Sequence, residues 1–197
     1  LILKILTEIG VMREEEKGGE LNIVFDNCSG QNKNNTVLRL APYLVEMGYF
    51  KAVNFVFLVV GHTKNSADTE KIYMKKDSHS MEELFENLNH SNRVTIHQTQ
   101  IEDFFDYDDF LKKFYSNFAG KIKQNHIFSI DENSWEFTKH GVKNKFIMTI
   151  KECDHPKATV QSHNCIKSGF ERDQRFKETL KLEEALLDRA NFIKKHP

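Results

Sequence analysis

Residues 21–34 read LNIVFDNCSGQNKN, and this stretch decides the fold class of the chain. Its first five residues form an apolar run that follows a Gly pair, and polar residues begin at Asp26. A short apolar run bounded by turn-forming residues is typical of a buried strand. We therefore expect a strand over residues 21–25 that ends just before Asp26.

A second apolar run, over residues 53–60, lies downstream and ends at Gly61. Between the two runs, apolar residues recur at helical spacing over residues 36–47. Strands that are apolar throughout and separated by a helix favour a covered, largely parallel sheet. The sequence thus predicts an α/β fold in which the two runs are neighbouring parallel strands.

The pattern changes after about residue 91 to that of a small α+β region. We expect a helix over 106–118, strands over 122–130, 135–138 and 145–151, an irregular segment over 153–169 and a polar helix over 173–195.

This organisation divides the chain into three parts. Residues 1–90 form the main α/β region, residues 91–152 extend the same domain, and residues 153–197 carry an irregular segment and the C-terminal helix. The chain begins at Leu1 within a helical pattern and without a start Met, so we expect it to be a fragment.

The composition is that of a folded chain without an overall attraction for polyanions. Of 197 residues, 39% are hydrophobic, and 28 basic residues face 29 acidic ones, so the net charge is -1. Contact with nucleic acid would therefore depend on a local patch. Three Cys argue against a disulfide scaffold, and the longest apolar runs are too short to span a bilayer. We expect an intracellular protein, nuclear or cytoplasmic, without a membrane partner.

Polar motifs follow both expected strands: DNCSGQNKN at residues 26–34 and GHTKNSAD at residues 61–68. Because parallel strands end at one edge of a sheet, Asp26 and Asp68 are candidates for a shared divalent-metal site. His62 is a candidate to contact substrate or position a water. Ordinary turn residues, a helix-start acid and a hydrogen-bonded strand-end histidine are the alternatives.

The two motifs, in this order and with a helix and a Phe/Val-rich strand between them, resemble a family of eukaryotic, transposon-associated proteins. That family is read as carrying a ribonuclease-H-like, DDE-transposase-type domain. The resemblance is close over residues 21–76 and looser over residues 77–151. It implies a ribonuclease-H-like mixed sheet flanked by helices, with Mg²⁺ or Mn²⁺ as cofactor. The implied activity is cleavage or strand transfer at phosphodiesters of nucleic acid, with DNA as the first choice.

The resemblance also implies roles for single residues. Asp26 matches the second catalytic carboxylate of such domains, and Asp68 is chosen for the third, with Glu70 as the fallback. No strand carrying the first carboxylate precedes Leu1, so the first strands of the fold are expected to be missing.

The residues expected to contact nucleic acid are Gln31, Asn32, Lys33, Asn34, Lys64 and Asn65. Solvated loop lysines are the alternative for Lys33 and Lys64. The competing function is a domesticated, catalytically inactive module that binds nucleic acid or protein, and a homo-oligomer remains open.

A further pattern is Cys153-x-His155 followed by His163-x-Cys165. These residue types suit zinc, but structural zinc sites usually have two or more residues between paired ligands. We therefore do not expect zinc at these four residues.

Overall fold

The computed structural model describes residues 18–28, 30–59, 106–137 and 143–167, together with Leu6, Ser80, Glu83 and Lys181. The candidate residues of the second motif lie outside the described residues, as does nearly all of the expected helix over 173–195. These candidates are His62, Lys64, Asn65, Asp68 and Glu70.

The described chain is an α/β structure built on one mixed sheet of six strands. The strand order is β1-β2-β3-β5-β4, with β6 also paired with β5. Among the strands that the structure describes, only β1 and β2 are parallel, and the other pairs are antiparallel. The strands are β1 (Glu20–Phe25), β2 (Ala52–Phe57), β3 (Ile127–Asp131), β4 (Trp135–Phe137), β5 (Lys143–Lys151) and β6 (Val160–Asn164).

The parallel pairing of the first two strands, predicted from the sequence, is confirmed. The pairs run in register from Glu20 opposite Ala52 to Phe25 opposite Phe57. Helix α2 (Asn35–Glu46) connects the two strands, and Asn34 begins it by accepting a hydrogen bond from the Val37 amide at 3.0 Å. Such a cap satisfies an amide that has no partner within the helix.

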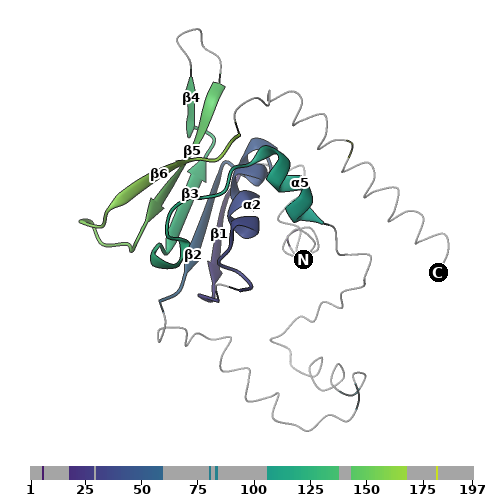
Figure 1. Cartoon of the computed structure of the whole chain (residues 1–197), viewed down its shortest axis with the longest axis vertical. Helices are drawn as coiled ribbons and strands as arrows, with labels where there is room; N and C mark the ends of the chain where they lie inside the picture. The colour runs from purple at the N-terminus through teal and green to yellow at the C-terminus, as the bar shows by residue number, and fades with distance from the viewer. Residues whose placement is uncertain are drawn as a thin grey trace, which may run out of the picture.

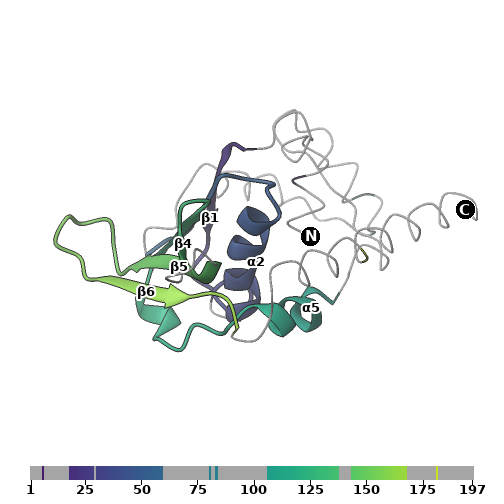
Figure 2. The ribbon, with the colours of Figure 1, turned by 90° about the horizontal axis from the view of Figure 1, so that it is seen from above.

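The two α-helices of the described residues lie on one face of the sheet, α2 against the strands and α5 (Tyr107–Phe114) beside α2 (Figures 1 and 2). Arg39 of α2 joins them through a 2.8 Å ion pair with Asp108. Hydrogen bonding by Thr36, together with the Arg39 charge, keeps the pKa of Asp108 below its usual value. Within the described part of the chain, no helix has the length and apolarity needed to cross a bilayer.

The core lies between α2 and the sheet and is rich in phenylalanine. Alternate residues of each central strand point into it, as the period of two requires. Phe25 stacks on Phe57 at a centroid distance of 5.1 Å and meets Phe55 edge-on at 5.2 Å. Phe57 in turn meets Phe128 edge-on at 5.7 Å, so the rings connect β1, β2 and β3.

Strand β1 is at the edge of the sheet as far as the described strands go, since it pairs with β2 alone. Its Val24 points away from the core and is 59% exposed.

The later elements differ from the expectations in three places. Residues 122–124 form a 3-10 turn, η4 (Ile122–Gln124), so only residues 127–131 of that region are a strand. Helix α5 ends at Phe114 because Tyr115 turns extended and pairs with Ile166. The expectation of an irregular segment over 153–169 is wrong, because β6 pairs with β5 from Val160 to Asn164.

The Phe55→Ala variant should lower the free energy of unfolding by about 3–5 kcal/mol, because Phe55 is fully buried and truncation leaves a cavity. Urea unfolding monitored by circular dichroism measures the change. Val56→Ala, on the opposite face of the same strand, is the matched control and should cost less than about 1.5 kcal/mol. Equal losses in both variants would contradict the one-sided core.

Candidate functional site

The loop of residues 26–34 is a compact turn at the carboxyl end of β1. The carbonyl of Cys28 accepts hydrogen bonds from the amides of Gln31, Asn32 and Lys33 at 2.9–3.2 Å. The side chain of Asn34 donates to the Gln31 carbonyl at 2.9 Å while it also caps α2. The loop is therefore fixed at its centre and at the start of the helix.

Lys33 is buried inside this loop, with 2% of its surface exposed. Its Nζ donates to Asn27 Oδ1 at 2.8 Å and to the Lys123 carbonyl at 3.0 Å. The same Nζ lies 5.4 Å from the centroid of the Phe57 ring, within the range of a cation–π contact. Burial lowers the pKa of Lys33, and these partners stabilise its charge. Lys33 thereby joins β1, β2 and η4.

The start of β3 meets the end of β2 at the same edge of the sheet. Nδ1 of His126 lies 2.8 Å from the Phe57 carbonyl, and the Phe57 amide donates to the His126 carbonyl at 2.7 Å. Figure 1 draws the purple loop of residues 26–34 and the teal turn around η4 at the lower end of the sheet.

The other described candidates of the first motif lie in the same loop as this buried lysine. Asp26 is exposed and follows Phe25 directly, and Gln31 is exposed as well. Asn32 and Asn34 are half-buried. The pairing of Asp26 with Asp68 falls outside the described residues, so it stays a prediction.

The structure does not bring the two Cys/His pairs together. Cys153 and His155 are exposed in the loop between β5 and β6. His163 lies three residues into β6 from Val160, which is about 10 Å along the strand. Burial raises the pKa of the Cys165 thiol to about 12, and this disfavours the thiolate that zinc needs. Among the residues described, no three potential ligands gather around a point that could hold a metal ion.

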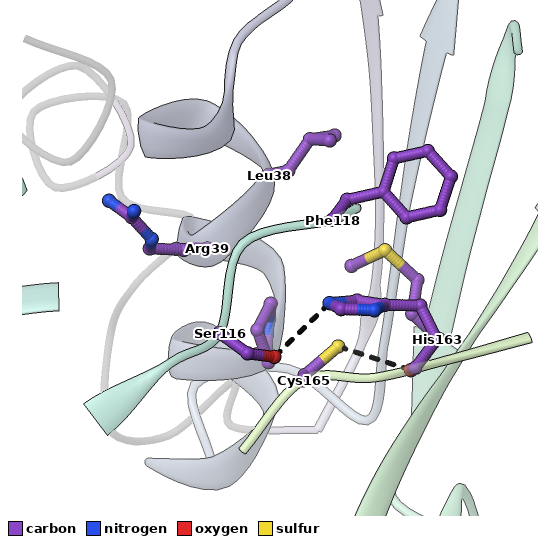
Figure 3. Close-up of a pocket in the computed structure, with 8 residues that line it drawn as sticks. Leu38, Arg39, Ser116, Phe118, His163 and Cys165 are labelled. Atoms are coloured by element: carbon purple, nitrogen blue, oxygen red, sulfur yellow. Dashed lines mark hydrogen bonds between the residues drawn. The ribbon is translucent and has the colours of Figure 1, made fainter. Parts of the chain in front are cut away.

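His163 instead lines a small cavity between α2, β5, β6 and the chain after α5. Its volume is about 10 Å³, at the lower limit for a single water. Figure 3 shows His163 turned toward Ser116, while Arg39 points away from both. The eight residues that line the cavity are Leu38, Arg39, Pro42, Ser116, Phe118, Met148, His163 and Cys165.

The Ser116 and His163 pair in this cavity is not arranged as a nucleophile with its base. The Ser116 hydroxyl donates to the Asn164 carbonyl at 2.5 Å, so its hydrogen is not directed at His163. Nε2 of His163 lies 3.2 Å from Ser116 Oγ and is assigned as the donor of that contact. The pair therefore fastens the chain after α5 to β6.

Sequence reasoning missed the residues of η4, which the fold brings to the first motif from 90 positions away. Lys121 and Lys123 are exposed on this turn, and Asn125 is buried beneath it. The signal available in the sequence was a lysine-bearing stretch without a single acid, over residues 110–130.

The Lys33→Ala variant should reduce the free energy of unfolding by about 1–3 kcal/mol, because it leaves Asn27 Oδ1 and the Lys123 carbonyl without their donor. Urea unfolding measures the loss. Lys123→Ala keeps the accepting carbonyl and removes an exposed side chain, so it should change stability by less than about 0.5 kcal/mol. A Lys33 variant as stable as the Lys123 variant would contradict the assigned contacts.

Stability should fall as the pH drops below about 6.5, because burial lowers the pKa of His163 from its ordinary value of 6.5. The unfolded chain then binds the proton at a higher pH than the folded protein does, so protonation favours unfolding. Melting temperatures between pH 8 and pH 5 measure the effect. The His163→Gln variant keeps a donor for Ser116 and should lose part of this pH dependence. A variant that follows the wild-type curve would show that His163 is not responsible.

One family model matches most of the chain. The family described as a domain of unknown function (DUF7869) matches residues 1–147, which include β1 to β4, helices α2 and α5 and the first part of β5. No curated protein and no solved structure matches the chain. Because the match spans well over half of the 197 residues, this chain belongs to the DUF7869 family.

Proposed function

We propose that this chain is part of a metal-dependent domain that processes phosphodiesters of nucleic acid, with DNA as the first choice of substrate. Asp26 and Asp68 are its candidate metal-binding and catalytic carboxylates, and His62 is its candidate substrate-positioning residue. The proposal follows the transposase-like motifs of residues 26–34 and 61–68.

The single observation that carries the proposal is the register of the two parallel strands. Phe25 and Phe57 are paired, so the first motif begins beside Leu58. The Leu58 amide donates to the Phe25 carbonyl at 3.0 Å, which continues the pairing to this point. The second motif begins three residues after Leu58, at Gly61. The first motif therefore begins where β1 ends, and the described chain after β2 leads toward the second motif from the same end of the sheet, where open α/β sheets place their ligands.

The chemistry of Asp26 fits a hard divalent cation such as Mg²⁺ or Mn²⁺. Its carboxylate is exposed, and such cations prefer oxygen ligands and retain waters or phosphate oxygens. When bound, the cation supplies positive charge that stabilises the reacting phosphate. The protein's own part is to hold Asp26 in place, and the Lys33 hydrogen bond to the neighbouring Asn27 fixes the start of the loop.

A ribonuclease-H-like arrangement is the finer fold that we propose for these strands. A parallel β1-α2-β2 unit within an otherwise antiparallel mixed sheet supports it. In this arrangement β1 is the strand that carries the second carboxylate, and its side away from β2, where no described strand pairs, is the place for a further strand.

A binding module without chemistry is the second candidate. The specific observation in its favour is that Asn27, Lys33 and Asn34 all make internal hydrogen bonds that build the loop. A loop so constructed can present a rigid surface to nucleic acid or protein whether or not Asp26 holds a metal.

The Asp26→Asn variant of the full-length protein should lose Mn²⁺-dependent cleavage of DNA by 100-fold or more, roughly the loss expected when a group that stabilises transition-state charge is removed. Cleavage rates on labelled oligonucleotides measure it. Asp154→Asn, at an exposed carboxylate of the β5–β6 loop, is the control and should keep the wild-type rate. The Asp68→Asn variant should resemble Asp26→Asn. If both variants cleave as fast as the wild type, the binding module is the better reading.

A further inference from the structure

The charges of this chain balance overall but are unevenly placed. Residues 27–45 and 110–130 contain no Asp or Glu, although acids make up 29 of the 197 residues. The hydrogen bond between Lys33 Nζ and the Lys123 carbonyl brings these two acid-free stretches together beside Asp26. The exposed lysines of the 110–130 stretch therefore lie next to the loop that follows β1.

The turn η4 in this region is held by buried side chains. Lys33 donates to the Lys123 carbonyl, and Nδ2 of Asn125 donates to the Lys121 carbonyl at 3.0 Å. Lys33 and Asn125 are each 2% exposed. Buried side chains therefore hold the carbonyls of Lys121 and Lys123, while the side chains of these two lysines are exposed.

The backbone at Gly120, just before η4, is closely packed against the core. A Cβ added to Gly120 would stand 2.3 Å from Cζ of Phe118, so the backbone lies directly on that ring. Phe118 is buried and meets Phe128 of the core edge-on at 6.1 Å. The backbone that carries the two exposed lysines is accordingly attached to the core and is not a loose surface loop.

We infer that Lys121, which directly precedes η4, and Lys123 within η4 bind the phosphodiester backbone of nucleic acid beside Asp26. This inference deepens the proposed function, on which it rests, by naming the residues that hold the substrate backbone. Lys33 is not one of the residues that bind this backbone, because its ammonium already donates to Asn27 Oδ1 and to the Lys123 carbonyl.

Nucleic acid is the occupant that the charges favour. Exposed lysines that release counterions from phosphates give binding without sequence preference, and such contacts fix the register of the backbone. The carbonyl of Lys123 contacts Lys33, so a nucleic-acid backbone held at this turn lies close to the loop that begins at Asp26. An acidic protein segment would use the same charges, so it is an outcome of the test.

The test is a salt titration of oligonucleotide binding by the full-length protein in EDTA, so that no metal chemistry takes part. Lys121→Gln/Lys123→Gln should weaken binding of duplex DNA on the order of 50-fold at 0.1 M salt, and reduce the slope of log K against log[salt] by about 1.8. The Lys121→Arg/Lys123→Arg variant keeps both charges and should bind like the wild type.

The matched control is Lys51→Gln/Lys113→Gln, which removes two exposed lysines outside η4 and should leave the slope unchanged. Melting temperatures confirm that all variants fold. Single-stranded DNA and RNA probes show which nucleic acid is preferred, and a polyglutamate probe shows whether any acidic chain is bound.

An unchanged slope in the η4 variant, an equal loss in the control, or polyglutamate bound as tightly as DNA would overturn the inference. The proposed function fails separately, through wild-type cleavage by the Asp26→Asn variant. Loss of DNA binding in the η4 variant together with active Asp26→Asn protein would support the inference and reject the metal-dependent role of Asp26.

Discussion

The contacts of the buried Lys33 ammonium determine how the chain is arranged at the carboxyl ends of β1 and β2. One nitrogen reaches Asn27 Oδ1, the Lys123 carbonyl and the face of the Phe57 ring. Three segments that are distant in the sequence are thereby held at one point. Burying a charge is costly unless it is paired or hydrogen-bonded, and these partners offset that cost for Lys33. The position of Asp26 follows from the same contact, because Asn27 is its neighbour.

The rest of the sheet supplies a rigid frame for that contact. Phe57 belongs to the chain of edge-to-face and stacked rings that connects β1, β2 and β3, so the ring beneath Lys33 has little freedom to move. On the far side, Asn125 also accepts from Gln161 of β6 at 3.4 Å, which joins η4 to the last strand. Hydrogen bonds therefore hold this end of the sheet from the loop after β1 across to β6.

The part of the fold that the sequence predicts is the part set by local pattern. Residues 21–25 and 53–57 are apolar runs between turn residues, and their parallel pairing with an intervening helix is confirmed. The pattern could not predict β6, because its exposed residues from Val160 to Ser162 show no apolar alternation. Its strand conformation comes from pairing with β5, which is a tertiary effect.

At the candidate site, too, the sequence predicts the local features and misses those that depend on long-range contacts. The polar motif after β1 is visible in the sequence, but the burial of Lys33 is not, because a lysine among Asn and Gln residues looks like a solvated one. The lysines of η4 are equally ordinary until a hydrogen bond across 90 positions places them beside that motif. Local composition thus indicates which residues could take part in chemistry. Long-range contacts decide which lysines are exposed to solvent and which are buried in internal hydrogen bonds. A near-zero net charge is for this reason no argument against nucleic-acid binding, since exposed lysines can lie on a segment that carries no acid, as residues 110–130 do.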